Sequence, residues 1–207
     1  MNNNNHKSNR LIGLTGGIAT GKTTVSNYLT KTYKLPIFDA DVYAREVVEK
    51  GSPILDQLYD RYGAKIRLED GSLNRPELGK IIFNHTEERK WVEAQIHPAV
   101  RDKFLEAIAQ LEPDATAVLA IPLLFEANLT YLPSEIWVVS CSAELQRDRL
   151  QQRNGLSEKE AQARINSQLP LAEKCDRADV VLDNCGDLSQ LYEQVDRAVR
   201  SRIAQNH

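Results

Sequence analysis

Short apolar runs without alternation recur along this chain, and longer stretches with helical spacing separate them. Runs that are apolar at every position are typical of strands in a parallel sheet whose two faces are covered. The alternation with helices therefore predicts an α/β protein with a doubly wound parallel sheet. Five strands are expected, at residues 11–15, 35–38, 117–121, 136–140 and 179–182.

A long stretch of helical character, residues 42–114, interrupts this alternation between the second and third expected strands. Its apolar residues fall at helical spacing in three pieces, and Asn74 ahead of Pro76 has the pattern of a helix start. A crossover between parallel strands needs far fewer residues, so we expect an inserted helical subdomain that binds a second substrate. A cap that only adds stability is the alternative.

A second insertion, residues 153–177, separates the fourth and fifth expected strands. Ser157 and Glu160 have the spacing of a capping box, which predicts a helix start. The stretch is polar and rich in Arg and Lys, which fits a mobile lid over ATP. The core of the domain, which spans residues 11–207, then consists of residues 11–41, 115–152 and 178–207.

Composition narrows the class of protein. The 207 residues carry a net charge of −3 and are 42% hydrophobic, which favours neither nucleic acid nor a membrane surface as a partner. The longest apolar run, residues 117–125, is too short to span a bilayer. Residues 1–10 lack the apolar segment of a signal peptide and are expected to be a disordered tail. Three widely spaced cysteines indicate reduced thiols in a cytoplasmic protein, which we expect to be a monomer or small homo-oligomer.

The strongest chemical signal lies in residues 16–23, which read GGIATGKT and match the phosphate-binding pattern GxxxxGK[ST]. An apolar run precedes the loop and a helix is expected after it, and this arrangement forms an anion site. Lys22 supplies a charge for the β- and γ-phosphates, and the Thr23 hydroxyl can bind Mg²⁺. The chain is therefore expected to bind a nucleoside triphosphate.

Polar residues follow the ends of all five expected strands, and ligands of open α/β sheets lie outside those ends. Asp39 and Asp41 follow the second strand. A kinase acting on an alcohol needs a carboxylate for the hydroxyl proton, so we assign Asp41 as the base, held by Arg45 one turn on. Asp39 is its orienting or metal-linked neighbour. The alternative is that both carboxylates only cap a helix.

Basic residues near the lid are the other candidates. Arg149 and Arg153 lie four residues apart on one helix face, where arginine can neutralise the transferring phosphoryl group. Solvated surface arginine is the alternative. Lys174 and Arg164 are weaker lid candidates, and His97 is expected to be structural or to contact substrate.

Two absences narrow the nucleotide chemistry. No NKxD motif follows the phosphate loop, so a guanine-specific GTPase is disfavoured. The third expected strand leads into Ile121 and Pro122, without the usual magnesium-linked aspartate. Metal contacts would then depend on Thr23, the ATP oxygens and an aspartate from the second strand.

Seven segments stand out along the chain, in this order: GLTGGIATGKTTV at residues 13–25, DADVYAREVV at 39–48, NRPEL at 74–78, IHP at 96–98, PLLFE at 122–126, QRDR at 146–149 and ADVVLDN at 178–184. Together they resemble the dephospho-CoA kinase family from residue 11 to about residue 203. The resemblance implies a fold similar to that of nucleoside monophosphate kinases, with a five-stranded parallel core, a helical CoA-substrate domain and a lid. It also implies that ATP phosphorylates the 3′-hydroxyl of dephospho-CoA, the last step of CoA biosynthesis.

By this resemblance Asp41 activates the ribose hydroxyl, and Lys22 and Arg149 hold the ATP phosphates. Thr23 holds Mg²⁺. Ala19 stands where the family usually has Gly, at a position where we expect only slight stiffening. Contacts to ATP are expected from Gly17, Ile18, Ala19, Thr20, Gly21, Lys22, Thr23, Thr24, Arg149 and Asn184, the last near the adenine. Contacts to dephospho-CoA are expected from Thr15, Asp39, Asp41, Arg45, His97, Leu123 and Phe125.

Two other functions compete with this one. A nucleoside or nucleoside monophosphate kinase would have the same architecture and a different acceptor. An ATP-binding regulatory module would bind nucleotide without phosphoryl transfer.

Overall fold

The computed structural model describes residues 9–201, except for the side chain of Asn84. The expected disordered tail, residues 1–10, therefore lies mostly outside the described residues. Its last residue corrects the prediction, because Arg10 opens the first strand. The Arg10 guanidinium pairs with the Glu135 carboxylate at 2.5 Å and donates to the carbonyl oxygens of Ala198 and Val199. These bonds hold a polar residue that the sequence pattern assigned to a tail.

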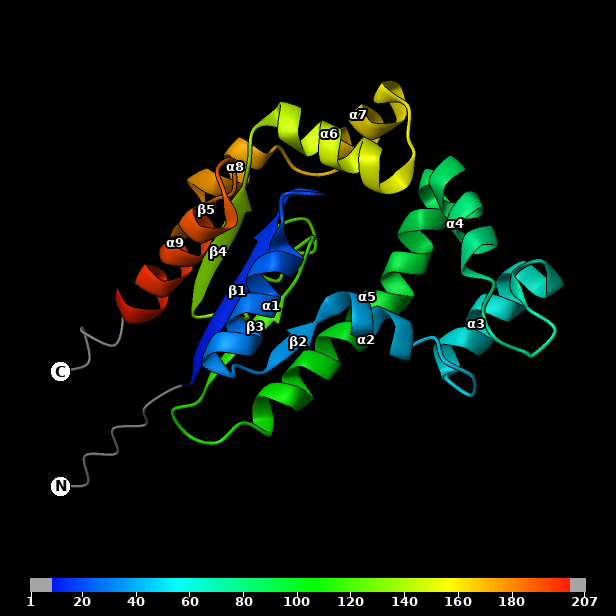
Figure 1. Cartoon of the computed structure of the whole chain (residues 1–207). Coiled ribbons are helices and arrows are strands. Elements are labelled where there is room, and N and C mark those ends of the chain that lie inside the picture. The colour runs from blue at the N-terminus through cyan, green and yellow to red at the C-terminus, as the bar shows by residue number, and fades with distance from the viewer. Residues whose placement is uncertain (1–8, 202–207) are drawn as a thin grey trace, which may run out of the picture. The chain divides into compact units, whose positions relative to one another are not determined.

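Five strands form one sheet, as predicted, with bounds that shift by one or two residues. The strand order is β2-β3-β1-β4-β5, and β1 pairs in parallel with both β3 and β4, which in turn pairs in parallel with β5 (Figure 1). The carboxyl ends of these strands share one edge of the sheet. The strands are β1 (Arg10–Gly16), β2 (Ile37–Asp39), β3 (Thr116–Ala120), β4 (Glu135–Ser140) and β5 (Val180–Asp183).

The chain divides into two compact units. The sheet unit comprises residues 1–38 and 111–207, and the helical unit comprises residues 39–110. Helices of the sheet unit are α1 (Lys22–Tyr33), α6 (Ala143–Asn154), α7 (Glu158–Asn166), α8 (Leu171–Asp176) and α9 (Leu188–Ser201). Helices of the helical unit are α2 (Ala40–Glu46), α3 (Pro53–Tyr62), the 3₁₀ helix η1 (Gly63–Ile66), α4 (Arg75–Asn84) and α5 (Thr86–Ala109).

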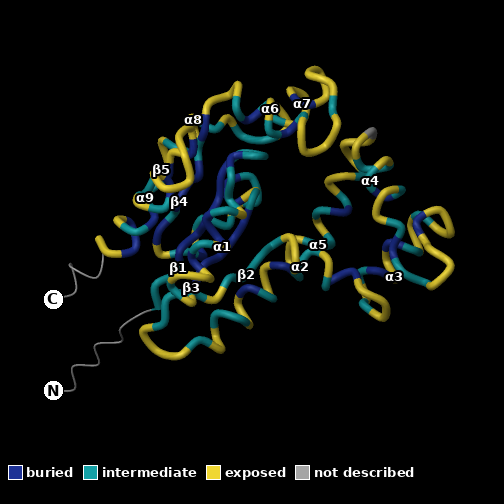
Figure 2. Tube along the Cα trace, viewed as in Figure 1, coloured by how far each residue is buried: buried dark blue, intermediate teal, exposed yellow. Residues whose placement is uncertain are grey.

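The core of the sheet unit is built from the apolar runs that predicted the strands. Figure 2 shows β1, β3 and β4 buried along most of their length. Burial of these side chains supplies the main driving force for folding and fixes the strand ends that bear the polar residues. The largest cluster combines β1, β4 and β5 with α1 and α9, and it includes Ile12, Leu14, Val25, Leu29, Trp137, Val139, Leu182, Leu191 and Val195.

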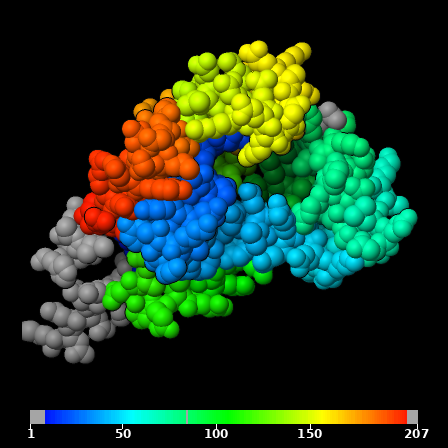
Figure 3. Space-filling view, in the orientation of Figure 1, coloured from blue at the N-terminus to red at the C-terminus, as the bar shows by residue number. Residues whose placement is uncertain are grey.

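Helix α1, which follows the phosphate loop, is fastened to α9 by aromatic side chains. Tyr28 stacks on Tyr192 with ring centroids 4.0 Å apart. The hydroxyls of Tyr28 and Tyr33 both donate to one carboxylate oxygen of Asp196, at 2.9 and 2.8 Å. In Figure 3 the red and orange atoms of the segment that contains α9 lie directly against blue atoms of the segment that contains α1. The helix that presents the loop is therefore anchored on its outer side.

The helical unit begins its helices with local caps. Ser52 caps α3, and Asn74 caps α4 with Pro in its first turn, which confirms the start predicted at Asn74. Helices α3 and α5 are joined by Arg61, whose guanidinium pairs with Glu88 at 2.7 Å and lies 4.4 Å from the ring centroid of Trp91. Leu55, Leu58, Val92, Val100 and Phe104 are buried within this unit.

Candidate active site

The phosphate loop joins β1 to α1, as the sequence predicts. Gly21 precedes the first turn of α1 with a φ of 109°, in the region that favours glycine. A side chain at Gly21 would also collide with the amide nitrogen of Asn184. The amides of a helix's first turn have no acceptor within the helix, and the helix dipole is positive at this end. The loop therefore has a geometry that suits an anion, which keeps Lys22 and Thr23 as candidates for phosphate binding.

The backbone at Ala19 differs from the prediction, which was that alanine in place of glycine would stiffen the loop only slightly. Its φ is 62°, in the left-handed region that a residue with a Cβ atom disfavours. A residue other than glycine there costs about 1–2 kcal/mol. The position where the family usually has Gly is therefore a position of backbone strain in this chain.

Three polar side chains form hydrogen bonds with the backbone of the phosphate loop. The Asn184 amide donates to the Thr20 carbonyl oxygen at 2.7 Å, and the Gln146 amide donates to the Ile18 carbonyl oxygen at 2.8 Å. The Ile18 amide in turn donates to the side-chain oxygen of Gln168 at 2.9 Å. Asn184 and Gln146 are each buried, so these bonds exclude water from the back of the loop.

These contacts refine the predicted roles. Asn184 is expected near the adenine, and its side chain is hydrogen-bonded to the loop backbone, which adds a supporting role. Gln146 appears in the sequence only as part of the QRDR segment, and Gln168 was not singled out. A glutamine looks like a surface residue in a sequence, and no local spacing reveals a partner more than 100 residues away.

The two candidate arginines differ in their surroundings. Arg149 donates to the carbonyl oxygen of Asn184 at 3.0 Å, and its other terminal nitrogen is buried without a partner among the described residues. That buried donor fits an anionic ligand at the strand ends. Arg153 and Arg164 are exposed, and Arg153 bonds to the neighbouring Asn154. Arg149 is therefore the stronger candidate.

Two cysteines lie close to this arginine. Burial raises the pKa of the Cys141 thiol, and the nearby charge of Arg149 opposes that rise. The pKa of the Cys185 thiol is also raised, mainly by its hydrogen bond with Asp183. Both thiols are free and are therefore favoured in the protonated, unreactive form.

Lys174 was named as a lid candidate, and its position corrects that prediction. The side chain is completely buried, and its ammonium pairs with Glu126 at 2.8 Å. A side chain without exposed surface cannot reach out to phosphates from the lid. The helix start predicted at Ser157 is confirmed, since Ser157 and Glu160 form a capping box at the start of α7.

Three residues near the ends of β1 and β3 were expected to contact the acceptor. Thr15 is completely buried and its hydroxyl donates to the Pro122 carbonyl oxygen at 3.1 Å, so its side chain serves the fold. Phe125 is also buried, with the guanidinium of Arg177 4.4 Å from its ring centroid. Leu123 is exposed, which leaves its side chain accessible.

The aspartate pair opens the helical unit. Asp39 caps α2, with its carboxylate accepting from the Asp41 amide at 2.8 Å, while Asp41 is exposed in the first turn. Asp39 therefore caps a helix, as the alternative expected, and this leaves its predicted role beside Asp41 untested. Arg45 is exposed and forms no ion pair with Asp41 in the described part of the chain, contrary to expectation. His97 is exposed on α5.

Similarity to known proteins identifies the family of this chain. The family model for dephospho-CoA kinase matches residues 10–190. The chain belongs to the dephospho-CoA kinase family. A relative named dephospho-CoA kinase from Trichormus variabilis is 59% identical over 194 residues, covering 94% of this chain and 98% of the relative. One from Synechocystis is 55% identical over 193 residues, covering 93% and 96%.

Solved structures agree with the family. The dephospho-CoA kinase from Campylobacter jejuni has a TM-score of 0.70 at 27% identity, covering 95% of this kinase and 98% of that chain. Protein TT1252 from Thermus thermophilus has a TM-score of 0.78 at 33% identity, covering 96% and 98%. A shikimate kinase from Bacteroides thetaiotaomicron, 17% identical with a TM-score of 0.53, shares the fold. The predicted α/β class and kinase activity are confirmed.

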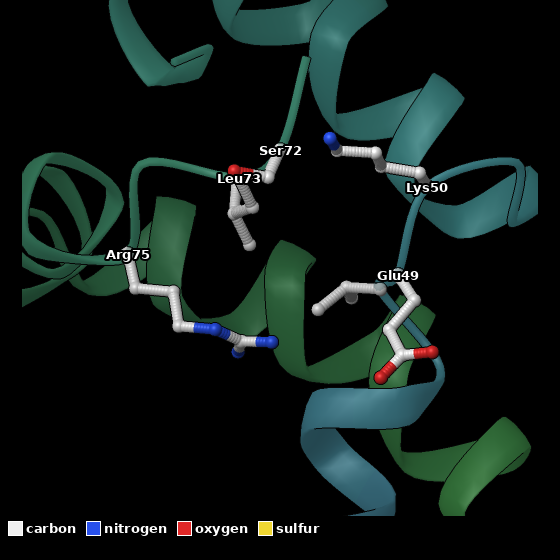
Figure 4. A pocket seen from close by; sticks show the side chains of 6 residues that line it. Glu49, Lys50, Ser72, Leu73 and Arg75 are labelled. Carbon is white, nitrogen blue, oxygen red and sulfur yellow. The ribbon is translucent and has the colours of Figure 1, made fainter. Parts of the chain in front are cut away.

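The helical unit of this kinase contains a pocket of about 420 Å³. Arg75 extends from one side of it, and Glu49 and Lys50 lie on the other (Figure 4). Both cations are already engaged, because Arg75 donates to the Arg45 carbonyl oxygen and Lys50 pairs with Asp70. The pocket therefore makes no separate case for an anion site. Ser72, Leu73 and Val48 complete its lining.

Residues 9–201 contain no group of three or more His, Cys, Asp or Glu side chains that could hold a metal ion. The Thr23 hydroxyl at the loop is the candidate protein ligand for a metal bound to ATP. Within the same residues, no helix has the length and apolar character that crossing a membrane requires.

Proposed function

We propose that this chain transfers the γ-phosphate of ATP to the 3′-hydroxyl of dephospho-CoA, which yields CoA and ADP in the last step of coenzyme A biosynthesis. The match of the dephospho-CoA kinase family model over residues 10–190 carries the proposal. The phosphate loop and the buried donor of Arg149 support it, because both suit a triphosphate.

In the proposed reaction the 3′-oxygen attacks the γ-phosphorus, and the bond to the β–γ bridging oxygen breaks. The hydroxyl proton passes to Asp41, and ADP leaves. Loop amides, Lys22 and Arg149 neutralise charge that develops on the phosphoryl oxygens. Mg²⁺ bound to ATP would add charge neutralisation, with Thr23 as its protein ligand.

The acceptor is proposed to bind through the helical unit. Asp39, Arg45 and His97 belong to that unit, and Leu123 is an exposed candidate from the sheet unit. A cytoplasmic location and a monomer or small homo-oligomer stay predictions of the sequence.

The test is ADP release by purified protein with Mg-ATP and a panel of acceptors. We expect turnover with dephospho-CoA and formation of CoA with one added phosphate at the ribose 3′-position. Turnover only with a nucleoside or nucleoside monophosphate would replace this acceptor. ATP binding without transfer to any acceptor would favour a regulatory module.

A further inference from the structure

A buried cation lies behind the phosphate loop. Lys174 of α8 has no exposed surface, and its ammonium contacts three acceptors. Glu126 accepts at 2.8 Å, and the carbonyl oxygens of Gly16 and Pro122 each accept at 3.4 Å. An ammonium has three N–H donors, so the cation is fully partnered.

The partners of Lys174 join the phosphate loop to residues 168–174, which lie near the end of the predicted lid. Gly16 ends β1 and opens the phosphate loop, and Glu126 follows β3. The same Glu126 oxygen accepts from the Leu169 amide at 2.9 Å. The side chain of the preceding residue, Gln168, accepts from the backbone amide of Ile18 in the loop. Residues 168–174 are thus fastened to the loop at two points, Gly16 and Ile18.

A cation is a costly means of filling a buried position. Removing an ammonium from water carries a large penalty, and an apolar side chain of similar volume often stabilises a fold equally well. Unlike an apolar side chain, the charge of Lys174 can polarise the backbone groups that it contacts. A cation on the Gly16 carbonyl oxygen polarises the peptide unit whose N–H belongs to Gly17, which makes that amide a stronger donor. Inward-facing amides are the groups with which such loops bind phosphate.

We propose that Lys174, together with Glu126, is a positioning pair for phosphoryl transfer. The pair fixes the first half of the phosphate loop against residues 168–174, so that the loop amides meet the γ-phosphate in one geometry. The inference deepens the proposed function and rests on it. Neither residue is assigned a contact with substrate.

The central experiment compares Lys174→Met with the double variant Lys174→Met/Glu126→Gln. The double variant leaves no unpaired buried charge, so we expect it to recover most of the stability that the single variant loses. We expect kcat in the double variant to stay about 10–100-fold below that of wild type, because misplacement of a reacting group by about 1 Å has such effects. The KM for ATP should rise about tenfold and the KM for dephospho-CoA should stay within about twofold.

Lys31→Met is the matched control, because Lys31 is an exposed lysine of the same unit. It should leave kcat and both KM values unchanged. If the double variant regains stability and kcat together, Lys174 is structural and the proposal is wrong. If Lys174→Met does not fold, the double variant decides the question by itself. Equal rises in both KM values would also contradict the proposal.

Gln168→Ala provides a second, milder test, since it removes one bond to Ile18 without touching a buried charge. We expect the affinity for a non-hydrolysable ATP analogue to fall about threefold, the effect of one hydrogen bond. If the affinity for the ATP analogue is unchanged in both this variant and the double variant, residues 168–174 do not position the phosphate loop and the proposal is wrong. A wild type that binds the analogue but does not phosphorylate dephospho-CoA contradicts the proposed function instead.

Discussion

Polar side chains behind the phosphate loop and polar side chains of the helical unit are held in opposite ways. Behind the phosphate loop, Gln146, Lys174 and Asn184 are buried and bonded to backbone atoms of the loop. In the helical unit, pairs such as Lys50–Asp70 and Arg61–Glu88 lie at the surface. Loss of one partner from a buried bond leaves a polar group unsatisfied, whereas surface pairs contribute little.

This difference indicates a division of labour. A loop fixed by buried bonds has few alternative conformations, which suits a phosphate site of demanding geometry. A unit whose charged pairs lie at its surface depends on apolar packing for its fold and can vary its exposed residues. We therefore expect substitutions around the loop to weaken ATP binding, whether or not they also lower kcat, and substitutions at the start of the helical unit to lower kcat alone.

Asp41→Asn is the sharpest test of whether the two units have different roles in the reaction. If Asp41 accepts the hydroxyl proton, kcat should fall by about a thousandfold, within the range for a general base. The affinity for ATP should not change, because the loop is untouched. Steady-state kinetics with dephospho-CoA and equilibrium binding of an ATP analogue measure the two effects.

Asp39→Asn is the control for this variant. An asparagine oxygen can still accept from the Asp41 amide, so the cap on α2 is kept. We expect a smaller loss of kcat than in Asp41→Asn. A larger loss in Asp39→Asn would exchange the roles of the two aspartates.

Asn184→Ala tests the buried side of the comparison. The variant leaves the Thr20 carbonyl oxygen without its partner, at a cost of about 1–3 kcal/mol. We expect the KM for ATP to rise about tenfold with a smaller change in kcat, because the loop loses its support. Gln194→Ala, which removes a half-buried side chain bonded to the amide and the carbonyl oxygen of Asp183, should change neither. Equal effects of the two variants would remove the special role of burial.

The sequence predicted those features that local constraints determine. The loop at residues 16–23, the five strands and the caps at Asn74 and Ser157 each depend on neighbouring residues, so short patterns suffice. The ion pair expected between Asp41 and Arg45 fails because an exposed pair at this spacing is worth only a few tenths of a kcal/mol.

Features that depend on distant partners were not predictable in this way. Lys174 reads as a surface lysine of a polar stretch, and only the fold brings it to Gly16, 158 residues away. Gln168 and Ile18 are 150 residues apart. The strain at Ala19 also escaped, because its φ is set by the bends of the loop and not by its own preference.

In the helical unit the Glu88 carboxyl has a shifted pKa, which predicts that the stability of this unit depends on pH. Hydrogen bonds from Arg61 and Tyr62 lower the pKa of Glu88 to about 2 from 4.5. A carboxylate with a lowered pKa stabilises the fold above its ordinary pKa, and this contribution is lost as the pH falls from about 4.5 towards 2. Wild type should therefore lose more stability than Glu88→Gln between pH 6 and pH 3.

Denaturant midpoints at both pH values, followed by Trp91 fluorescence in a Trp137→Phe background, measure this difference. Trp91 lies beside Arg61, so it reports on the helical unit. The affinity for ATP at pH 6 should be the same in both proteins. Identical losses of stability between the two pH values would show that the Arg61–Glu88 pair contributes nothing to this unit.

The smallest expected effect concerns the strain inside the loop. Ala19→Gly removes a Cβ atom at a φ of 62°, which relieves about 1–2 kcal/mol, and it gains conformational freedom in the unfolded chain that offsets about 0.4–1 kcal/mol. The net result should be a gain of about 0.5–1 kcal/mol in the free energy of unfolding. Ala163→Gly, in helix α7 of the same unit, should instead cost about 1 kcal/mol. Denaturant unfolding of both variants measures these opposite signs, and a loss of stability in Ala19→Gly would mean that the buried contacts around the loop, and not its backbone preference, determine its energy.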